Sequence, residues 1–213
     1  VAEIVSQVRD TRQVLIERKI DPLKLSNIVF MGMGEPFANY KHVINAIRII
    51  CDRDYGLKFS PRRVTVSTSG LIPNIAKLGI DSDVNLAISL NATDDDTRSQ
   101  LMPINRKYPI KEVLKACKVF NIKSRNKITF EYILIKDLND SKEDALRLVK
   151  LLAPIKAKVN LIPFNEYEGS GFKKPDKQKI STFLQILLDR KMIAITRKSK
   201  GADISAACGQ LRA

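Results

Sequence analysis

Short apolar runs rich in β-branched residues alternate along this chain with longer segments whose apolar residues recur at helical spacing. The expected strands are 27–31, 64–67, 86–89, 128–133, 159–162 and 193–196, and the expected helices are 4–15, 43–50, 72–78, 110–120, 145–152 and 180–188. Because the strand runs are apolar on both faces, the pattern indicates a parallel sheet covered by helices. The alternation therefore predicts an α/β protein. No linker or repeat divides it, so we expect a single domain over 1–213.

The size and composition fit one domain with its own hydrophobic core, because 44% of the 213 residues are hydrophobic. No run of about 18 uncharged apolar residues occurs, and the first ten residues lack the basic-then-apolar profile of an export signal. We therefore expect neither a membrane span nor secretion, and a cytoplasmic location. The first residue is Val1 inside a helical pattern, which favours a piece of a longer protein.

The inventory of reactive side chains is small. Cys51, Cys117 and Cys208 stand 66 and 91 positions apart without forming a C-x-x-C pair, and His42 is the only histidine. This spacing disfavours a disulfide framework and a local zinc site, and a lone histidine disfavours imidazole triads. We therefore expect no metal ligands in this chain. Its chemistry must depend on cysteine, carboxylates, amides, hydroxyls or a bound cofactor.

The charge balance is strongly basic, with 37 Lys and Arg against 23 Asp and Glu, a net charge of +14. Such an excess points to a polyanionic partner, most plainly nucleic acid, although a lysine-rich composition without function is the alternative. The basic residues gather in two clusters, Arg106, Lys107, Lys111, Lys115, Lys118, Lys123, Arg125 and Lys127, then Lys173, Lys174, Lys177, Lys179, Arg190, Lys191, Arg197, Lys198 and Lys200. Few acids lie near them, which favours a phosphate-backbone footprint.

Polar groups follow four of the expected strands, in the segments 32–36, 67–70, 89–92 and 163–165. The carboxyl ends of parallel strands meet at one edge, where α/β proteins bind ligands, so four such endings favour a polar ligand. A carboxylate at Glu35 could hold a ligand ammonium group, and Ser67 and Ser69 could bind a carboxylate or a ribose. Ser89, Asn91 and Asn165 could bind ribose hydroxyls or an adenine edge. The alternative is that these are ordinary turn residues.

The segment 201–211 places Cys208 among small residues, which suits a loop that presents a thiol. A buried structural cysteine is the alternative reading. Cys51 follows two isoleucines and Cys117 lies on an apolar helix face, so both should be core residues.

Six motifs in a fixed order carry a family resemblance: Met31-Gly32-Met33-Gly34-Glu35-Pro36, Val64-Thr65-Val66-Ser67-Thr68-Ser69-Gly70, Leu86-Ala87-Ile88-Ser89-Leu90, Met102-Pro103-Ile104-Asn105, Asn160-Leu161-Ile162-Pro163-Phe164-Asn165 and Ala207-Cys208-Gly209-Gln210-Leu211. The set resembles that of the radical S-adenosylmethionine (radical SAM) adenine methyltransferases, and most closely their RlmN-type branch. The resemblance implies a TIM-like (β/α) barrel of the radical SAM type, incomplete here, with about five of six core strands. The partial barrel would cover about 1–197 and a Cys-bearing tail 198–213.

The resemblance also implies roles for individual residues. Gly34 and Glu35 would hold the amino group of S-adenosyl-L-methionine, and Cys208 would be the cysteine that becomes methylated and carries the methyl group. The other cofactor-binding positions would be Ser67, Ser89, Leu90, Asn91 and Asn165. The family usually has His where this chain has Asn91, although an amide can still bond a ribose hydroxyl.

The implied reaction is methylation of carbon 2 of an adenine in large-subunit (23S) rRNA and, in some members, in tRNA. It requires a 4Fe-4S cluster, whose C-x-x-x-C-x-x-C motif lies upstream in the family and is not in this chain, and an electron donor such as flavodoxin. We therefore expect these residues alone to be inactive. The alternatives are a carbon-8 methyltransferase of the same family, a non-catalytic RNA-binding α/β module, and a barrel enzyme for a phosphorylated metabolite, for which only Gly169-Ser170-Gly171 resembles a phosphate loop.

Overall fold

The computed structural model describes residues 1–32, 34–120, 126–167 and 169–197. One parallel sheet of six strands runs through this part of the chain, in the order β1-β2-β3-β4-β5-β6. The strands are β1 (Ile28–Phe30), β2 (Val64–Thr68), β3 (Asn85–Ser89), β4 (Ile128–Leu134), β5 (Ala157–Pro163) and β6 (Ala194–Thr196). All six expected strands are therefore present, and the predicted α/β class is confirmed.

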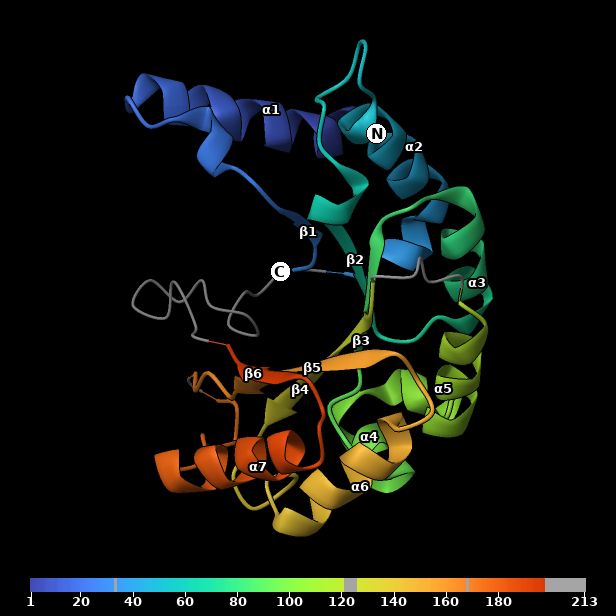
Figure 1. Ribbon diagram of the computed structural model, residues 1–213, viewed down its shortest axis with the longest axis vertical. Coiled ribbons are helices and arrows are strands. Elements are labelled where there is room, and N and C mark those ends of the chain that lie inside the picture. The colour runs from blue at the N-terminus through green and yellow to red at the C-terminus, as the bar shows by residue number, and fades with distance from the viewer. Residues whose placement is uncertain (33, 121–125, 168, 198–213) are drawn as a thin grey trace.

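Helices connect the strands and lie along the outside of the curved sheet (Figure 1). They are α1 (Ala2–Glu17), α2 (Tyr40–Cys51), α3 (Ile72–Asp81), α4 (Asp95–Leu101), α5 (Ile110–Val119), α6 (Lys142–Leu152) and α7 (Lys177–Asp189). Four short 3-10 helices join them: η1 (Pro22–Lys24), η2 (Pro36–Asn39), η3 (Pro61–Arg63) and η4 (Pro103–Arg106). Every helix expected from apolar spacing is present, whereas α4 was not expected, because its sequence is polar except for Leu101.

The sheet is open, as an incomplete barrel requires. In the described part of the chain, β1 pairs with β2, β6 pairs with β5, and these two edge strands do not pair with each other. The family resemblance implied about five core strands, whereas all six of the strand runs seen in the sequence join the sheet. The sixth strand, β6, is only three residues long. The tail 198–213 lies outside the described residues.

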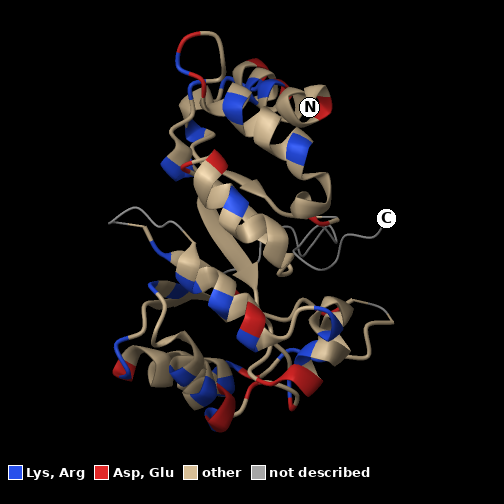
Figure 2. Cartoon of the chain, turned by 90° about the vertical axis from the view of Figure 1, so that its right-hand side faces the viewer, with Lys and Arg blue, Asp and Glu red and all other residues tan. Residues whose placement is uncertain are grey.

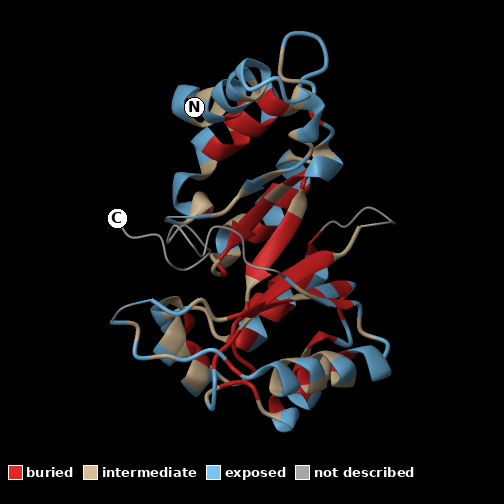
Figure 3. Ribbon diagram, turned by 90° about the vertical axis from the view of Figure 1, so that its left-hand side faces the viewer, coloured by how far each residue is buried: buried red, intermediate tan, exposed pale blue. Residues whose placement is uncertain are grey.

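The core follows the middle strands of the sheet, whose residues are mostly buried and drawn in red in Figure 3. Six of the seven residues of β4 are buried, and Phe130 and Tyr132 are completely enclosed. Leu86 and Ile88 of β3 are buried beside them. Because both faces of these strands lose contact with water, every position gains from an apolar side chain, which explains the unbroken apolar runs in the sequence.

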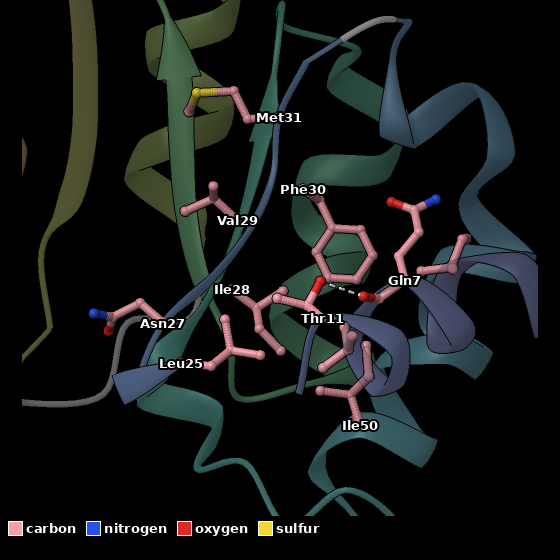
Figure 4. Close-up of a pocket in the computed structure, with 11 residues that line it drawn as sticks. Gln7, Thr11, Leu25, Asn27, Ile28, Val29, Phe30, Met31 and Ile50 are labelled. Carbon is pink, nitrogen blue, oxygen red and sulfur yellow. Dashed lines mark hydrogen bonds between the residues drawn. The ribbon is translucent and has the colours of Figure 1, made fainter. Parts of the chain in front are cut away.

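The edge strand β1 is less buried than the middle strands of the sheet. Val29 keeps 53% of its surface exposed, and a mostly apolar pocket lies between β1, α1 and α2 (Figure 4). Ile4 and Val8 of α1 line this pocket together with Phe30 of β1. The amphipathic helix α1 thus covers only part of the edge strand. No helix in the described residues is long and apolar enough to span a membrane.

Candidate ligand-binding rim

The parallel register brings the polar segments that follow β1, β2, β3 and β5 to one edge of the sheet. We call this edge the carboxyl rim and define it by residues 32, 34–35, 67–70, 89–91 and 163–165. It contains the seven cofactor-binding positions expected from the sequence: Gly34, Glu35, Ser67, Ser89, Leu90, Asn91 and Asn165. Contacts between side chains and backbone show how firmly each part of the rim is fixed.

Glu35 is held in place by both neighbouring loops. Its Oε1 accepts a hydrogen bond from the backbone N–H of Phe37 at 3.0 Å, which caps η2. Its Oε2 accepts from the N–H and from the Oγ–H of Ser69, each at 2.7 Å. Gly34 precedes it with φ at +79°, a conformation that favours glycine. The half-buried carboxylate therefore sits rigidly between β1 and β2, and retains acceptor capacity for a ligand cation.

A second carboxylate, Glu131, is buried in β4 and was missed by the sequence analysis. Ser67 Oγ–H donates to Glu131 Oε2 at 3.1 Å, across the intervening strand β3. Burial raises the pKa of Glu131, whereas the Ser67 hydrogen bond and the charge of Arg197 act in the opposite direction. A single carboxylate inside the apolar run 128–133 is the signal that could have identified it. The hydrogen bond to Glu131 thus fixes the position of the Ser67 hydroxyl.

Arg98 of α4 is also a missed residue, and it is fully buried. Its Nη2 donates to the carbonyls of Ser69 at 2.7 Å and Ser89 at 3.2 Å, and its Nε donates to the carbonyl of Leu90 at 3.0 Å. Its Nη1 donates to Asn105 Oδ1 at 2.8 Å. Burial lowers the pKa of Arg98 to about 10, so the side chain is still a cation at neutral pH. Polar helices carry no apolar periodicity, which is why the sequence analysis missed α4.

Asn91 is built into the rim through its side chain and its backbone. Its φ is +60°, a left-handed conformation that Asn tolerates better than most residues. Its Oδ1 accepts from the N–H of Ile133 at 3.1 Å, and its own carbonyl accepts from Asn139 Nδ2 at 2.7 Å. These bonds fasten the loop after β3 to β4. Asn91 therefore shapes the rim, and its amide oxygen is already engaged within the protein.

Asn165 follows β5 at the far side of the rim and is half-buried. The aromatic ring of the preceding residue, Phe164, packs against Tyr167 and Phe172 at centroid distances of 6.0 and 5.9 Å. Ring contacts therefore help to order the loop after β5.

The described cysteines are poor nucleophiles. Cys117 is buried on α5 and Cys51 is partly buried at the end of α2, where it packs against the core. Burial raises the pKa of both thiols, that of Cys117 to about 12. A thiolate is the reactive form of cysteine, so neither suits catalysis at neutral pH. Cys208, which the sequence analysis assigned to catalysis, lies outside the described residues.

The described residues do not fit a 4Fe-4S cluster. Such a cluster of the expected type takes several thiolates, whereas Cys51 and Cys117 lie on different helices. Within the described ranges no group of three or more His, Cys, Asp or Glu is arranged to hold a metal ion. We therefore derive no step of a reaction through a cluster.

Comparison with known proteins defines the class. Residues 5–149 match the family model described as the radical SAM superfamily, and this chain belongs to that superfamily. It is similar to proteins named "Dual-specificity RNA methyltransferase RlmN". It is 60% identical over 212 residues to the one from Desulfosudis oleivorans, covering 100% of this chain and 56% of that protein. It is 54% identical over 211 residues to the one from Geotalea uraniireducens, covering 99% and 59%.

A solved structure shows the same architecture. The crystal structure of a radical SAM methyltransferase from Sphaerobacter thermophilus matches with a TM-score of 0.91 and 45% identity, covering 98% of this chain and 60% of that one. The chain thus spans a little over half the length of the relatives that it matches. The radical SAM type of fold expected from the motifs is confirmed.

Proposed function

We propose that this chain is the S-adenosylmethionine-binding part of a radical SAM RNA methyltransferase that methylates carbon 2 of an adenine in 23S rRNA and in tRNA. The observation that carries the proposal is the fixed Glu35 carboxylate beside Gly34 on the carboxyl rim. The superfamily match and the similarity to proteins named as RNA methyltransferases support it. A cytoplasmic location and an electron donor such as flavodoxin are part of the same proposal.

In this proposal the rim binds S-adenosylmethionine along its length. Gly34 and Glu35 hold the ammonium group, because a carboxylate fixed by three hydrogen bonds meets a cation without reorganising. Ser67, the 89–91 segment and Asn165 provide the remaining contacts to the ligand's polar groups. The Oδ1 of Asn91 already accepts a hydrogen bond from β4, so the side-chain nitrogen is the atom better placed to contact the ligand. In this structure that nitrogen lies 3.2 Å from Met102 Sδ.

Cys208 carries the methyl group to the RNA in the proposed reaction. Carbon 2 of adenine lies between two ring nitrogens and is a poor nucleophile, so ordinary polar methyl transfer to it is slow. A sulfur carrier favours radical chemistry at the attached carbon, because sulfur stabilises an adjacent radical. Cys51 and Cys117 do not suit this role, because burial raises the pKa of both thiols.

RNA is the proposed partner, and the exposed lysines of α5 are the strongest part of its footprint. Lys111, Lys115 and Lys118 are all exposed on this helix. Figure 2 marks in blue where lysines and arginines lie along the chain. In the other basic cluster, Lys179 is paired with Asp137 and Asp140, and Lys173 with Glu166. Part of that second cluster is thus neutralised within the protein. The α5 face therefore offers more charge to phosphates.

The test uses the full-length protein, meaning this sequence within a chain of its relatives' length. Cys208→Ala should abolish RNA methylation, and mass spectrometry of the unmodified protein should find a methyl group on Cys208. Cys51→Ala is the matched control and should retain activity, because its thiol is outside the rim. Turnover by the Cys208→Ala variant near the unmodified rate would refute the proposal. A product methylated at carbon 8 would correct the specificity alone.

A further inference from the structure

We infer that Arg98 is a positioning residue for S-adenosylmethionine, holding the loops after β2 and β3 at the separation at which they bind the two ends of the ligand. The inference rests on the proposed function and adds a residue that contacts none of the ligand itself. Three observations support it: the backbone carbonyls that the guanidinium bonds, the hydrogen bonds that link one of these residues, Ser69, to Glu35, and the close packing of Gly70 and Asn105 around the guanidinium.

The side chain of Arg98 bonds two loops of the rim. Nη2 donates to the carbonyl of Ser69, after β2, and to the carbonyl of Ser89, at the end of β3. Nε donates to the next carbonyl, of Leu90. A guanidinium has five N–H donors in one plane, so it bonds both loops in a fixed geometry, whereas the three donors of a lysine ammonium rotate and impose no such plane. The distance between the loops is therefore set by the width of this group.

The connection extends to Glu35. The Ser69 backbone carbonyl binds Arg98, while the N–H and the Oγ–H of the same residue bind Glu35. Any shift of Ser69 away from Arg98 would move the donors that orient the carboxylate. Arg98 thus controls, through Ser69, the group proposed to bind the ligand ammonium. Through Ser89 and Leu90 it controls the segment proposed to bind the other end.

The surroundings are shaped around the guanidinium. A Cβ added to Gly70 would lie 3.3 Å from Arg98 Nη2 and 3.1 Å from Val113 Cγ2, and the φ of Gly70 is +111°. Behind the guanidinium, Asn105 accepts from Nη1 and uses its Nδ2 to donate to the Asp95 carbonyl and to Ser99 Oγ. The side chain is therefore fixed from both sides.

A purely stabilising role explains these contacts less well. In the described residues, the hydrogen-bond acceptors of Arg98 are carbonyl and amide oxygens. The negative charge of Asp95 also acts on this buried cation, but no carboxylate within the described ranges forms a direct ion pair with it. Removing a cation from water without such a partner is costly, and apolar side chains often stabilise a core better than buried charges do. The arrangement makes physical sense where the position of those carbonyls matters.

The experiment compares S-adenosylmethionine binding by the full-length protein and by its R98K variant, using equilibrium dialysis under anaerobic conditions. Lysine keeps the charge but loses the planar fork, so we expect affinity to fall about tenfold, the effect of losing one charge-assisted hydrogen bond. Affinity for RNA should stay unchanged. Leu148→Ala, a fully buried position on α6 away from the rim, is the control for lost stability, and should lower the melting temperature without changing ligand affinity.

Each outcome decides the inference. Equal ligand affinity of R98K and the unmodified protein would overturn it, as would an equal loss of affinity in Leu148→Ala. Failure of the unmodified protein to bind S-adenosylmethionine would overturn the proposed function and this inference together. If R98K does not fold, Asn105→Ala decides instead. It removes one support of the guanidinium, and should reduce ligand affinity by a smaller factor than tenfold but more than Leu148→Ala does.

Discussion

Glu131 is the residue whose ionisation should make the stability of the protein depend on pH. Burial raises its pKa, so the folded protein holds this proton more tightly than the unfolded chain does. The contribution of Glu131 to stability is therefore largest while its carboxyl is protonated, and falls as the pH rises from the ordinary glutamate range through the raised pKa. Glu131→Gln removes this titration and should flatten that decline. Urea unfolding at steps between about pH 4 and pH 8 measures it.

Glu166→Gln is the control, because the pKa of Glu166 is shifted in the opposite direction to that of Glu131. The pKa of Glu166 is lowered, first by the hydrogen bond from the N–H of Lys174 and then by Lys173, so its contribution is present at neutral pH and lost as the pH falls through the lowered pKa. The group is exposed, and its effect should be small. Identical pH profiles for the unmodified protein and Glu131→Gln would show that Glu131 does not titrate in this way.

Thiol reactivity tests the environment of the two described cysteines. Cys117 is 1% exposed and its pKa is raised to about 12, whereas Cys51 is only partly buried. Alkylation by iodoacetamide requires the thiolate and access to it, so Cys51 should react much faster than Cys117. Peptide mass spectrometry over a time course measures both rates. Equal rates in the folded protein, with equal rates in urea as the reference, would contradict the described core.

At the scale of single elements, α6 shows how local chemistry begins a helix. Ser141 Oγ accepts from the N–H of Asp144, and the Asp144 carboxylate accepts from the N–H and Oγ–H of Ser141, a complete capping box. Asp144 also bonds Arg147 and Thr93, which ties the start of α6 to the segment after β3. The cap therefore holds together two neighbouring connections of the sheet.

Removing this cap should cost measurable stability. Ser141→Ala should lower the free energy of unfolding by about 1 kcal/mol, the usual cost of losing a side-chain cap. Ser60→Ala is the matched control, because Ser60 precedes η3 without a side-chain capping bond. Chemical denaturation of both variants measures the difference. A Ser141→Ala variant no less stable than Ser60→Ala would show that the capping box contributes nothing.

The elements also show what sequence could and could not predict. The buried strands were predictable because both faces of a covered parallel sheet require apolar residues, as in 86–89 and 128–133. Helix α4 was not predictable from apolar spacing, because its sequence is polar except for Leu101 and the residue it buries is the cation Arg98. The positions of Glu35, Ser67 and Asn91 on the rim followed from the strand ends. Their bonds to Ser69, Glu131 and Ile133 depend on distances across strands, which no local pattern contains.

At the scale of the whole molecule, the net charge of +14 should govern RNA binding. Affinity of the full-length protein for RNA should fall steeply with salt, because each phosphate contact releases a counterion. Replacing Lys111, Lys115 and Lys118 by Glu should lower the log-log slope by about 0.7 for each single-strand contact that is lost. Lys179→Ala is the control with a small effect, since Asp137 and Asp140 already pair with it. A slope near zero would show that the charge is incidental.

The order of the sheet has a consequence for how the protein is made. Within the described residues, each strand from β2 to β6 pairs with the strand that precedes it in the chain, and none returns to pair with a strand further back. During synthesis, the pairing partner of each new strand has therefore already left the ribosome when that strand emerges. Strands β2 to β6 can therefore join the sheet one after another as they are translated. None of them depends on a distant later segment for the pairing with its preceding strand. Slow decoding between two strands would then give each new unit time to dock before the next appears.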